Sequence, residues 1–598
     1  MQCEKWRKSY EPLLPLYKPP ASLGKYDPYP AFPVGASCFQ VGYDALARAL
    51  AQQRFVLLDG EVGVFWNILR EQLQVAFQRL GISVRWHNVA EALKPAAEIE
   101  RLLAPFIGND DPVFGRLYDG RLADFFDVAK LATFRPDPSS MLTIVYGCGA
   151  ALVPYDGYLV FVEVPKNEVQ ARARAGQVAN LGATAPTSFR ALYKRLYFVD
   201  WVVLRKHKKV LLNRIALFVD AQRPETPVFV DGQIWRQALK AMSQCVFRTR
   251  PWFLPGPWGG QWLKRHLPFD TTNVSNYAWS YELIAPENGV LLESDGILLE
   301  CAFDWLMFCA ADNLLGEGTE VFGDFFPIRF DYLDTYDGGP LSIQCHPRLP
   351  YIRQQFGERW TQDEAYYIVD SQPDACVYLG LQASVDLIEF KRALERSERE
   401  NVPVAVEQFV QKLPAKRHDF FLIPSGTVHA AGKGNLVLEI SATPYLYTFK
   451  LYDWLRPDLD GGFRPLHLDH AFANIIATRK GERVREELVC RPQKVCQGDG
   501  WQLEHLPTHP EHFYDVFRLT FIGDVMLPTA PSCLVGNLVE GQSVVLETER
   551  GFRFRVNYAE TFVIPAAAQP CRVHNESDRP AKIVWAQLKP MQHLAAWR

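Results

Sequence analysis

The spacing of hydrophobic and polar positions changes near residue 248 and divides the chain into two halves of different character. Before this point, segments with apolar residues three and four apart alternate with short apolar runs, which is typical of helices and buried strands. After it, short alternating runs separated by Pro and Gly indicate antiparallel strands joined by turns. The pattern therefore predicts an α/β half followed by an all-β half.

The first half contains strand and helix candidates in alternation. A strand, a Gly-containing turn, a helix and a second strand follow one another, which makes a βαβ unit. After an irregular arm over residues 1–30, the chain is predicted to form a doubly wound α/β fold, so that residues 1–190 make the first domain. The segments behind this prediction are RFVLLDG, VGVFWNILREQLQVAFQRLG, ISVRWHNV, MLTIVYG, GYLVFVEV and PKNEVQARARAG.

Residues 191–247 look mixed and largely helical, with basic clusters such as RKHKK. A charge run of this kind usually forms a solvated face, so we interpret the stretch as a connector packed on the first domain. Beyond it, strand-length segments predict an antiparallel barrel over residues 248–495 with a helical insertion. The same pattern predicts a second barrel over residues 496–598.

Composition is that of a globular protein, since 48% of the 598 residues are hydrophobic and 22% are charged. The net charge of −4 and the absence of a basic stripe argue against nucleic acid as a partner. Acidic residues interrupt the most apolar stretch, residues 290–315, so no membrane span is expected. The 12 Cys are scattered singly and the N-terminus lacks an apolar signal segment, which favours reduced thiols and a cytoplasmic protein. The oligomeric state is not predicted.

Candidate chemistry lies in the first predicted barrel. In PLSIQCHP, the alternation of side chains along a strand points Gln344 and His346 to one face. Glu364 begins another strand, and His429 follows a turn that contains Pro and Gly. Two imidazoles, a carboxylate and an amide can form a zinc site with a position open for water or substrate. A single His on a strand is nevertheless more often a hydrogen-bonded core residue.

These segments resemble, in the same order, the signature of class I mannose-6-phosphate isomerases, a family of zinc cupins. PLSIQCHP is similar to that family's LSVQVHP-type motif, and DEAYYIVD to its TECWYVLD-type strand. The likeness runs from about residue 248 onward. It also includes RPWFLPGPWGGQWLKRHL, AWSYELIAPENG, FFLIPSGTVHAAGKGNLVLEI and YTFKLYDWLRPDLDGGFRPLHLDHA.

The resemblance implies a double cupin of two jelly-roll barrels, with a zinc ion in the first barrel and no metal in the second. One zinc per chain would be held by Gln344, His346, Glu364 and His429. It also implies an isomerase that interconverts mannose 6-phosphate and fructose 6-phosphate through a zinc-assisted cis-enediol. Such a reaction needs a Lewis acid, a general base and cations that hold the phosphate.

The sequence departs from the family at two positions. Gln362 stands where the family usually has Lys, and Lys450 stands where it usually has Arg. Lys450 keeps the charge but loses the guanidinium fork, and we assign it a catalytic role. Arg456 and Lys433 are predicted to bind substrate as compensating cations. Arg348 is a further candidate, and for Arg348 and Lys433 a solvated surface charge is the alternative.

Two further residues have open roles. Glu439 lies in NLVLEI, ten residues beyond His429, and the family carries Glu at the corresponding position. A carboxylate in an apolar strand is costly unless it is paired or useful, so Glu439 is predicted to be either catalytic or part of a structural ion pair. His467 is predicted to be structural or helix-capping.

The first domain resembles a P-loop nucleoside kinase whose loop is degenerate. In FVLLDGEVGVFW, Gly60 and Gly63 are followed by Val64, Phe65 and Trp66. A working P-loop needs Lys for the β- and γ-phosphates and Ser or Thr for magnesium. We therefore predict a structural or regulatory role without phosphotransfer.

Two functions remain open from the sequence. One is the isomerase, which the complete ligand set favours. The other is a metal-bearing cupin that binds or senses a sugar phosphate without catalysis, which the changes at Gln362 and Lys450 favour.

Overall fold

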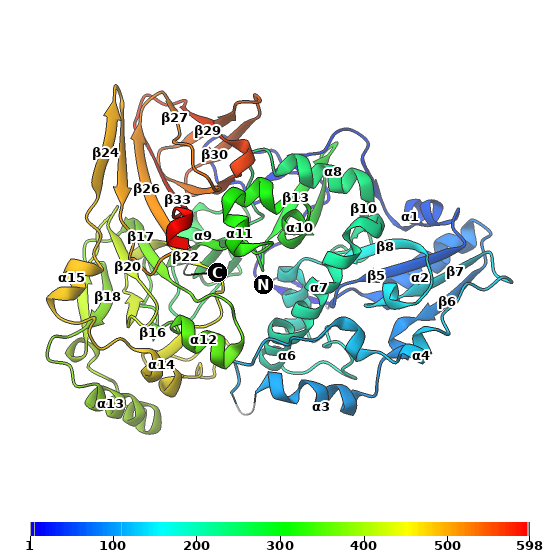
Figure 1. The fold of residues 1–598 in the computed structure, drawn as a ribbon, viewed down its shortest axis with the longest axis horizontal. Coiled ribbons are helices and arrows are strands. Elements are labelled where there is room, and N and C mark those ends of the chain that lie inside the picture. Colours follow the sequence, from blue (N-terminus) through cyan, green and yellow to red (C-terminus); the bar gives the residue numbers. More distant parts are fainter. Residues whose placement is uncertain (1, 5, 109–110, 595–596, 598) are drawn as a thin grey trace. The chain divides into compact units, whose positions relative to one another are not determined.

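The computed structural model describes residues 2–4, 6–108, 111–594 and 597, and Figure 1 shows its ribbon. The chain divides into two compact units. The first unit is Met1–Pro19, Ala31–Met242 and Pro286–Ala310, and the second is Pro20–Pro30, Ser243–Ala285 and Ala311–Arg598. Among the described residues, none of the helices combines the length and the apolar character that a membrane span requires.

A seven-stranded sheet forms the centre of the first unit. Five neighbouring strands run parallel, and two further strands at one edge are each paired antiparallel with the neighbour before them. The central parallel strands are buried on both faces, which explains their continuous apolar runs, whereas the edge strand over Val84–Asn88 is partly exposed. In order across the sheet the strands are β4 (Phe39–Val41), β10 (Val228–Asp231), β9 (Ile215–Asp220), β8 (Tyr158–Glu163), β5 (Phe55–Gly60), β7 (Leu142–Tyr146) and β6 (Val84–Asn88).

Helices accompany this sheet in the order that the hydrophobic pattern predicts. They are α1 (Tyr43–Leu50), α2 (Trp66–Arg79), α3 (Ala96–Ile107), α4 (Val128–Leu131), α5 (Lys166–Arg174), α6 (Phe189–Arg195), α7 (Trp201–Leu211) and α8 (Gly232–Met242). A short hairpin of β1 (Gln2–Glu4) and β2 (Arg7–Ser9) lies in the segment predicted as an irregular arm. The predicted α/β character of this half agrees with the sheet and its helices.

Of residues 191–247, interpreted as a connector, residues 191–242 are part of the first unit, because β9 and β10 extend its sheet beyond β8, and residues 243–247 belong to the second unit. The RKHKK cluster is only partly a solvated face, because Lys206 and Lys209 are exposed but His207 and Lys208 are buried. Lys208 is 2% exposed and forms ion pairs with Glu61 at 2.9 Å and Glu163 at 3.1 Å. A buried ammonium group requires such partners because an unpaired buried charge is costly.

Residues 286–310 also differ from the predicted boundary at residue 248, because they belong to the first unit. There β13 (Gly289–Ser294) pairs with β14 (Ile297–Ala302) and with β3 (Ala31–Pro33). Alternation predicts the strands but not the sheet that they join, since sheet membership depends on partners distant in sequence.

The second unit is built from two pairs of antiparallel sheets. The first sheet pair contains a six-stranded sheet, β11 (Trp252–Leu254), β12 (Trp279–Leu283), β15 (Ile328–Asp334), β22 (Asn435–Ala442), β17 (Glu364–Ser371) and β20 (Phe420–Ile423). Its five-stranded partner is β19 (Val410–Pro414), β18 (Cys376–Leu381), β21 (His429–Ala431), β16 (Ile343–Cys345) and β23 (Phe449–Tyr452).

The second sheet pair follows in the sequence and has one apolar core, to which both of its sheets contribute. Its six-stranded sheet is β24 (Gln493–Gly498), β25 (Trp501–Leu506), β26 (Tyr514–Phe521), β33 (Ala581–Leu588), β28 (Leu534–Glu540) and β31 (Thr561–Ile564). The four-stranded sheet is β27 (Asp524–Met526), β32 (Cys571–Asn575), β29 (Ser543–Thr548) and β30 (Arg553–Asn557).

Helices are inserted among these strands, as the sequence predicts for the segment after Ser384. The side chain of Asp386 caps α13 by accepting hydrogen bonds from two backbone N–H groups of its first turn. The helices after α8 are α9 (Trp262–His266), α10 (Phe303–Leu315), α11 (Thr319–Phe322), α12 (Leu349–Phe356), α13 (Leu387–Glu400), α14 (Leu468–Asn474), α15 (Glu482–Glu487) and α16 (Met591–Leu594).

Candidate metal site

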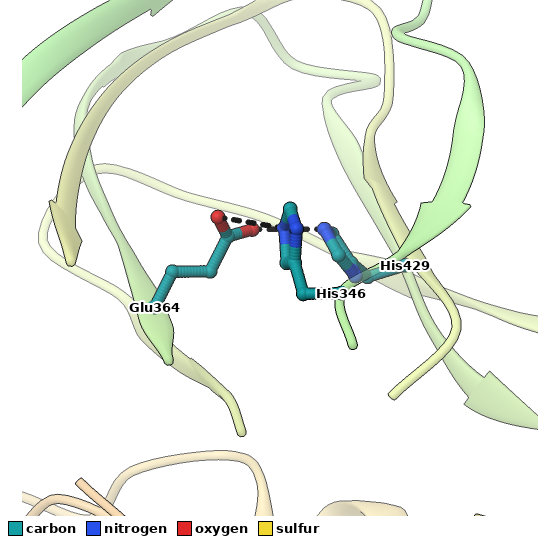
Figure 2. A group of neighbouring side chains, drawn as sticks. All are labelled: His346, Glu364 and His429. Atoms are coloured by element: carbon teal, nitrogen blue, oxygen red, sulfur yellow. Dashed lines mark ion pairs between the residues drawn. The ribbon is translucent and has the colours of Figure 1, made fainter. Parts of the chain in front are cut away.

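The four predicted metal ligands come together between the sheets of the first sheet pair. Glu364 begins β17 in the six-stranded sheet, whereas Gln344 lies in β16 and His429 begins β21 in the five-stranded sheet. Gln344 and His429 are direct partners in the register of β16 and β21, so their side chains share one face. Figure 2 shows Glu364, His346 and His429 directed toward one another.

The distances among these side chains are those of a group that can hold one cation. Nε2 of His346 lies 3.0 Å from Oε2 of Glu364, and Nε2 of His429 lies 2.8 Å from Oε1. One ligand atom from each residue lies within 4.8 Å of the other two, and all three side chains are buried. Imidazole nitrogen and carboxylate oxygen together suit a divalent transition metal.

The outer hydrogen bonds of the two histidines fix their tautomers. Nδ1 of His346 is 3.0 Å from the carbonyl oxygen of Tyr447, and Nδ1 of His429 is 2.9 Å from that of Thr427. Because a carbonyl oxygen only accepts, each Nδ1 carries the proton and each neutral ring has its lone pair on Nε2. Both lone pairs face the oxygens of Glu364. Acceptors that face one another in a buried site need a cation between them, so the arrangement fits a metal ion.

Two glutamines surround the carboxylate. The amide nitrogen of Gln344 lies 3.4 Å from Nε2 of His429. If the amide group rotates by half a turn, its oxygen takes the position of the nitrogen and could bind a metal ion. Gln362 donates an N–H to Oε2 of Glu364 at 3.0 Å. Burial would raise the pKa of Glu364, but the positive charge of protonated His346 and His429 outweighs it and holds the pKa well below its usual value; between neutral rings, a bound cation would supply that charge instead. The carboxylate is therefore anionic, as a metal ligand must be.

A polar surface continues from Glu364 across the six-stranded sheet. Cross-strand partners point to the same face, and neighbouring strands are about 4.8 Å apart. The surface therefore reaches about 10 Å from β17 to β15. It consists of two rows of buried residues, Glu364–Ser441–Arg329 and Tyr366–Glu439–Asp331.

Glu439 forms an ion pair with Arg329, so the structural alternative for this residue is observed and its catalytic role stays a prediction. Nε of Arg329 is 2.8 Å from Oγ of Ser441 and 3.3 Å from Oδ1 of Asp331. Burial raises the pKa of Asp331 to about 6, against the effect of Arg329. Sequence reasoning missed Arg329 and Asp331. The available signal was the alternation in PIRFDYLD, which places both on one face.

Lys450, the predicted catalytic cation, lies next to the candidate metal ligand Gln344 on the neighbouring strand. It lies on β23 as the register partner of Gln344, so both side chains share one face. His467 precedes α14 as its N-cap residue, and its Nδ1 lies 3.4 Å from the backbone nitrogen of Lys450. Arg348 donates to the carbonyl oxygen of Ala473 at 2.9 Å, in keeping with its alternative as a surface charge.

The two predicted substrate-binding cations lie in other surroundings. Arg456 donates to Asp453 at 3.0 Å and to the carbonyl oxygen of Pro340 at 2.9 Å. Lys433 is exposed in the turn after β21. It lies four residues beyond His429, which corresponds to roughly 13 Å along an extended strand. Neither residue is brought to the metal ligands by a contact that the structure shows for the described residues, so their roles stay predictions.

The loop after β5, where a P-loop would lie, has its own buried partners. The carbonyl oxygen of Gly63 accepts from Nη1 of Arg172 at 2.7 Å, and Arg172 is fully buried. Glu61 in the same loop is buried and paired with Lys208. A carboxylate at this place disfavours a bound phosphate, because like charges repel strongly in a buried site.

We expect no phosphotransferase activity from the first unit, because its loop lacks the Lys and the hydroxyl group of a kinase and carries the buried carboxylate of Glu61. The measurement is ATP consumption with nucleosides and sugars as acceptors. ATP-dependent phosphorylation that disappears on replacement of Asp59 or Arg172 would contradict this prediction.

Comparison with known proteins gives a family model that matches the first part of the chain and similar proteins that match other residues. Residues 42–244 match a family model described as a domain of unknown function, DUF8485. The mannose-6-phosphate isomerase of Streptococcus mutans is 27% identical over 286 residues, which are 47% of this chain and 81% of that protein. The mannose-6-phosphate isomerase ManA of Bacillus subtilis is 36% identical over 146 residues, which are 24% of this chain and 43% of that protein.

Among solved structures, the mannose 6-phosphate isomerase from Bacillus subtilis aligns with a TM-score of 0.46 at 21% identity, and the alignment covers 58% of this chain and all of that one. The sequence matches are stronger than this structural one. The chain is thus similar, over slightly less than half its length, to proteins named mannose-6-phosphate isomerases.

Proposed function

We propose that this chain is a zinc-dependent sugar-phosphate isomerase of the cupin type, which interconverts mannose 6-phosphate and fructose 6-phosphate. The observation that carries the proposal is the convergence of Gln344, His346, Glu364 and His429 between two sheets. The similarity to proteins named mannose-6-phosphate isomerases supports the same class of reaction. Protein ligands that leave one position open are typical of catalytic zinc sites.

Aldose–ketose isomerisation moves a proton between two adjacent carbon atoms. When bound, zinc would polarise the substrate oxygens as a Lewis acid. Glu439, placed beside Arg329 by their ion pair, is our candidate for the group that takes the proton, and Asp331 is a second carboxyl group on the same face. Lys450, next to Gln344 across the strands, would bind an oxygen of the substrate as a point charge.

A protein that binds or senses a sugar phosphate without catalysis is the second candidate, and two contacts favour it. Gln362 hydrogen-bonds to Glu364 but brings no positive charge, and Arg456 is already paired with Asp453. These contacts leave the cations expected from the family's pattern without a shown counterpart at these two positions, which weakens the case for turnover by the family's chemistry.

A coupled assay that reports fructose 6-phosphate distinguishes the two candidates. For the isomerase we expect steady turnover of mannose 6-phosphate by the purified protein. A sensor would bind mannose 6-phosphate in a calorimetric titration but show no turnover. If neither turnover nor binding is detected, both candidates are wrong.

A further inference from the structure

The loop between β20 and β21, residues 424–428, carries His429 into the metal site and is held by one buried arginine. Nη1 of Arg479 donates to the carbonyl oxygens of Pro424 at 3.0 Å and Ser425 at 2.5 Å, and to Oγ1 of Thr427 at 2.8 Å. Arg479 is 5% exposed. A single guanidinium thus satisfies three acceptors of a loop whose own backbone forms no sheet.

The same loop contacts the segments that supply His429 and Glu364. The carbonyl oxygen of Thr427 accepts the hydrogen bond from Nδ1 of His429 at 2.9 Å. The backbone N–H of Ser425 donates to Oδ1 of Asp363 at 2.7 Å, and Asp363 immediately precedes Glu364. The position of the loop therefore sets the direction of the His429 ring and supports the start of β17.

Arg479 is held in turn by the second sheet pair. Its Nη2 donates to Oε1 and Oε2 of Glu511 at 2.9 and 3.0 Å, and Glu511 lies in the segment between β25 and β26. From the start of β26, the hydroxyl of Tyr514 donates to the carbonyl oxygen of Ile440 on β22 at 2.7 Å. The second sheet pair thus contacts Arg479 and β22, the strand next to β17, which begins with Glu364.

We propose that Arg479, anchored by Glu511, is a positioning residue that controls how tightly the metal is held, and that the second sheet pair supports the metal site through this contact. The inference rests on the metal site of the proposed function. Outer contacts that orient a metal-binding His commonly change metal affinity about ten- to a hundredfold when they are removed. Here the guanidinium acts one step further out, through the carbonyl oxygen of Thr427.

The test is the zinc dissociation constant, measured by competition with a chelator, together with hydrogen exchange of the peptide over residues 420–432. For Arg479→Met we expect the dissociation constant to rise about tenfold or more and exchange to increase in this peptide above the rest of the chain. Arg479→Lys keeps the charge but cannot reach both the loop and Glu511, so a smaller rise is expected. Glu511→Gln should raise the constant by at most about fivefold, because a half-exposed ion pair contributes little.

The matched control is Arg483→Met. Arg483 lies four residues from Arg479 but forms an exposed pair with Glu487, so its replacement should leave zinc affinity and exchange of the loop unchanged. A folded Arg479→Met protein with wild-type zinc affinity and wild-type exchange would overturn the inference. If Arg479→Met does not fold, wild-type values in both Arg479→Lys and Glu511→Gln would overturn it. A wild-type protein that binds no zinc would refute the metal site itself, and exchange of the loop would still report on the support by Arg479.

Discussion

His429→Ala is expected to leave the purified protein with almost no zinc and to lower kcat/KM for mannose 6-phosphate by roughly a thousandfold or more. His429 supplies one of three ligand atoms that lie within 4.8 Å of each other. A metal acting as Lewis acid contributes several kcal/mol to a transition state, and about 1.4 kcal/mol corresponds to tenfold in rate. Zinc content by elemental analysis and the coupled assay are the two measurements.

A histidine outside the metal site provides the control for this variant. His505 lies on β25 and pairs with Asp515 at 2.7 Å, so His505→Ala should keep both zinc and activity. If His429→Ala retained full zinc, His429 would not be a ligand. If it lost zinc but stayed fully active, the metal would have no part in the reaction.

Lys450→Ala is expected to lower kcat by roughly a hundredfold or more while zinc content stays normal, which is the usual effect of removing one preorganised charge from a site. The structure places Lys450 beside Gln344 across β23 and β16, on the face that carries the ligands. Lys450→Arg keeps the charge and adds a fork, so it should remain active.

Lys412→Ala is the control for Lys450. Lys412 lies on β19, is about half exposed and forms an ion pair with Glu407. It should leave kcat unchanged. A Lys450→Ala protein as active as wild type would make Lys450 a structural residue, and Arg456 would be tested next.

The candidate ligand set could be proposed from the sequence because the short segments that carry it resemble, in the same order, the motifs of a known family of zinc cupins. In PLSIQCHP, Gln344 lies on β16 and His346 follows directly after the end of that strand, and Glu364 and His429 each stand at the start of a strand. The order of residues within each segment is local in sequence, whereas the position of the loop before His429 also depends on Arg479, which lies 50 residues after His429.

The charge partners of the site could not be predicted in the same way, because they come from strands far apart in sequence. Glu439 is paired by Arg329, 110 residues earlier in the numbering, through the register of β15 and β22. Lys208 is buried for the same reason, since its partner Glu61 lies on the loop after β5. Composition marks these residues as charged, but only the tertiary fold decides whether a charge is solvated or paired.

The central claim is that one metal ion, held by these ligands, makes the chain an isomerase. It is tested most directly by removing metal with a chelator, adding zinc back in steps and following the conversion of mannose 6-phosphate to fructose 6-phosphate. We predict that activity is lost with the metal and returns linearly until about one zinc per chain is bound. Activity that persists in metal-free protein, or protein that regains one zinc without any turnover, would contradict the claim.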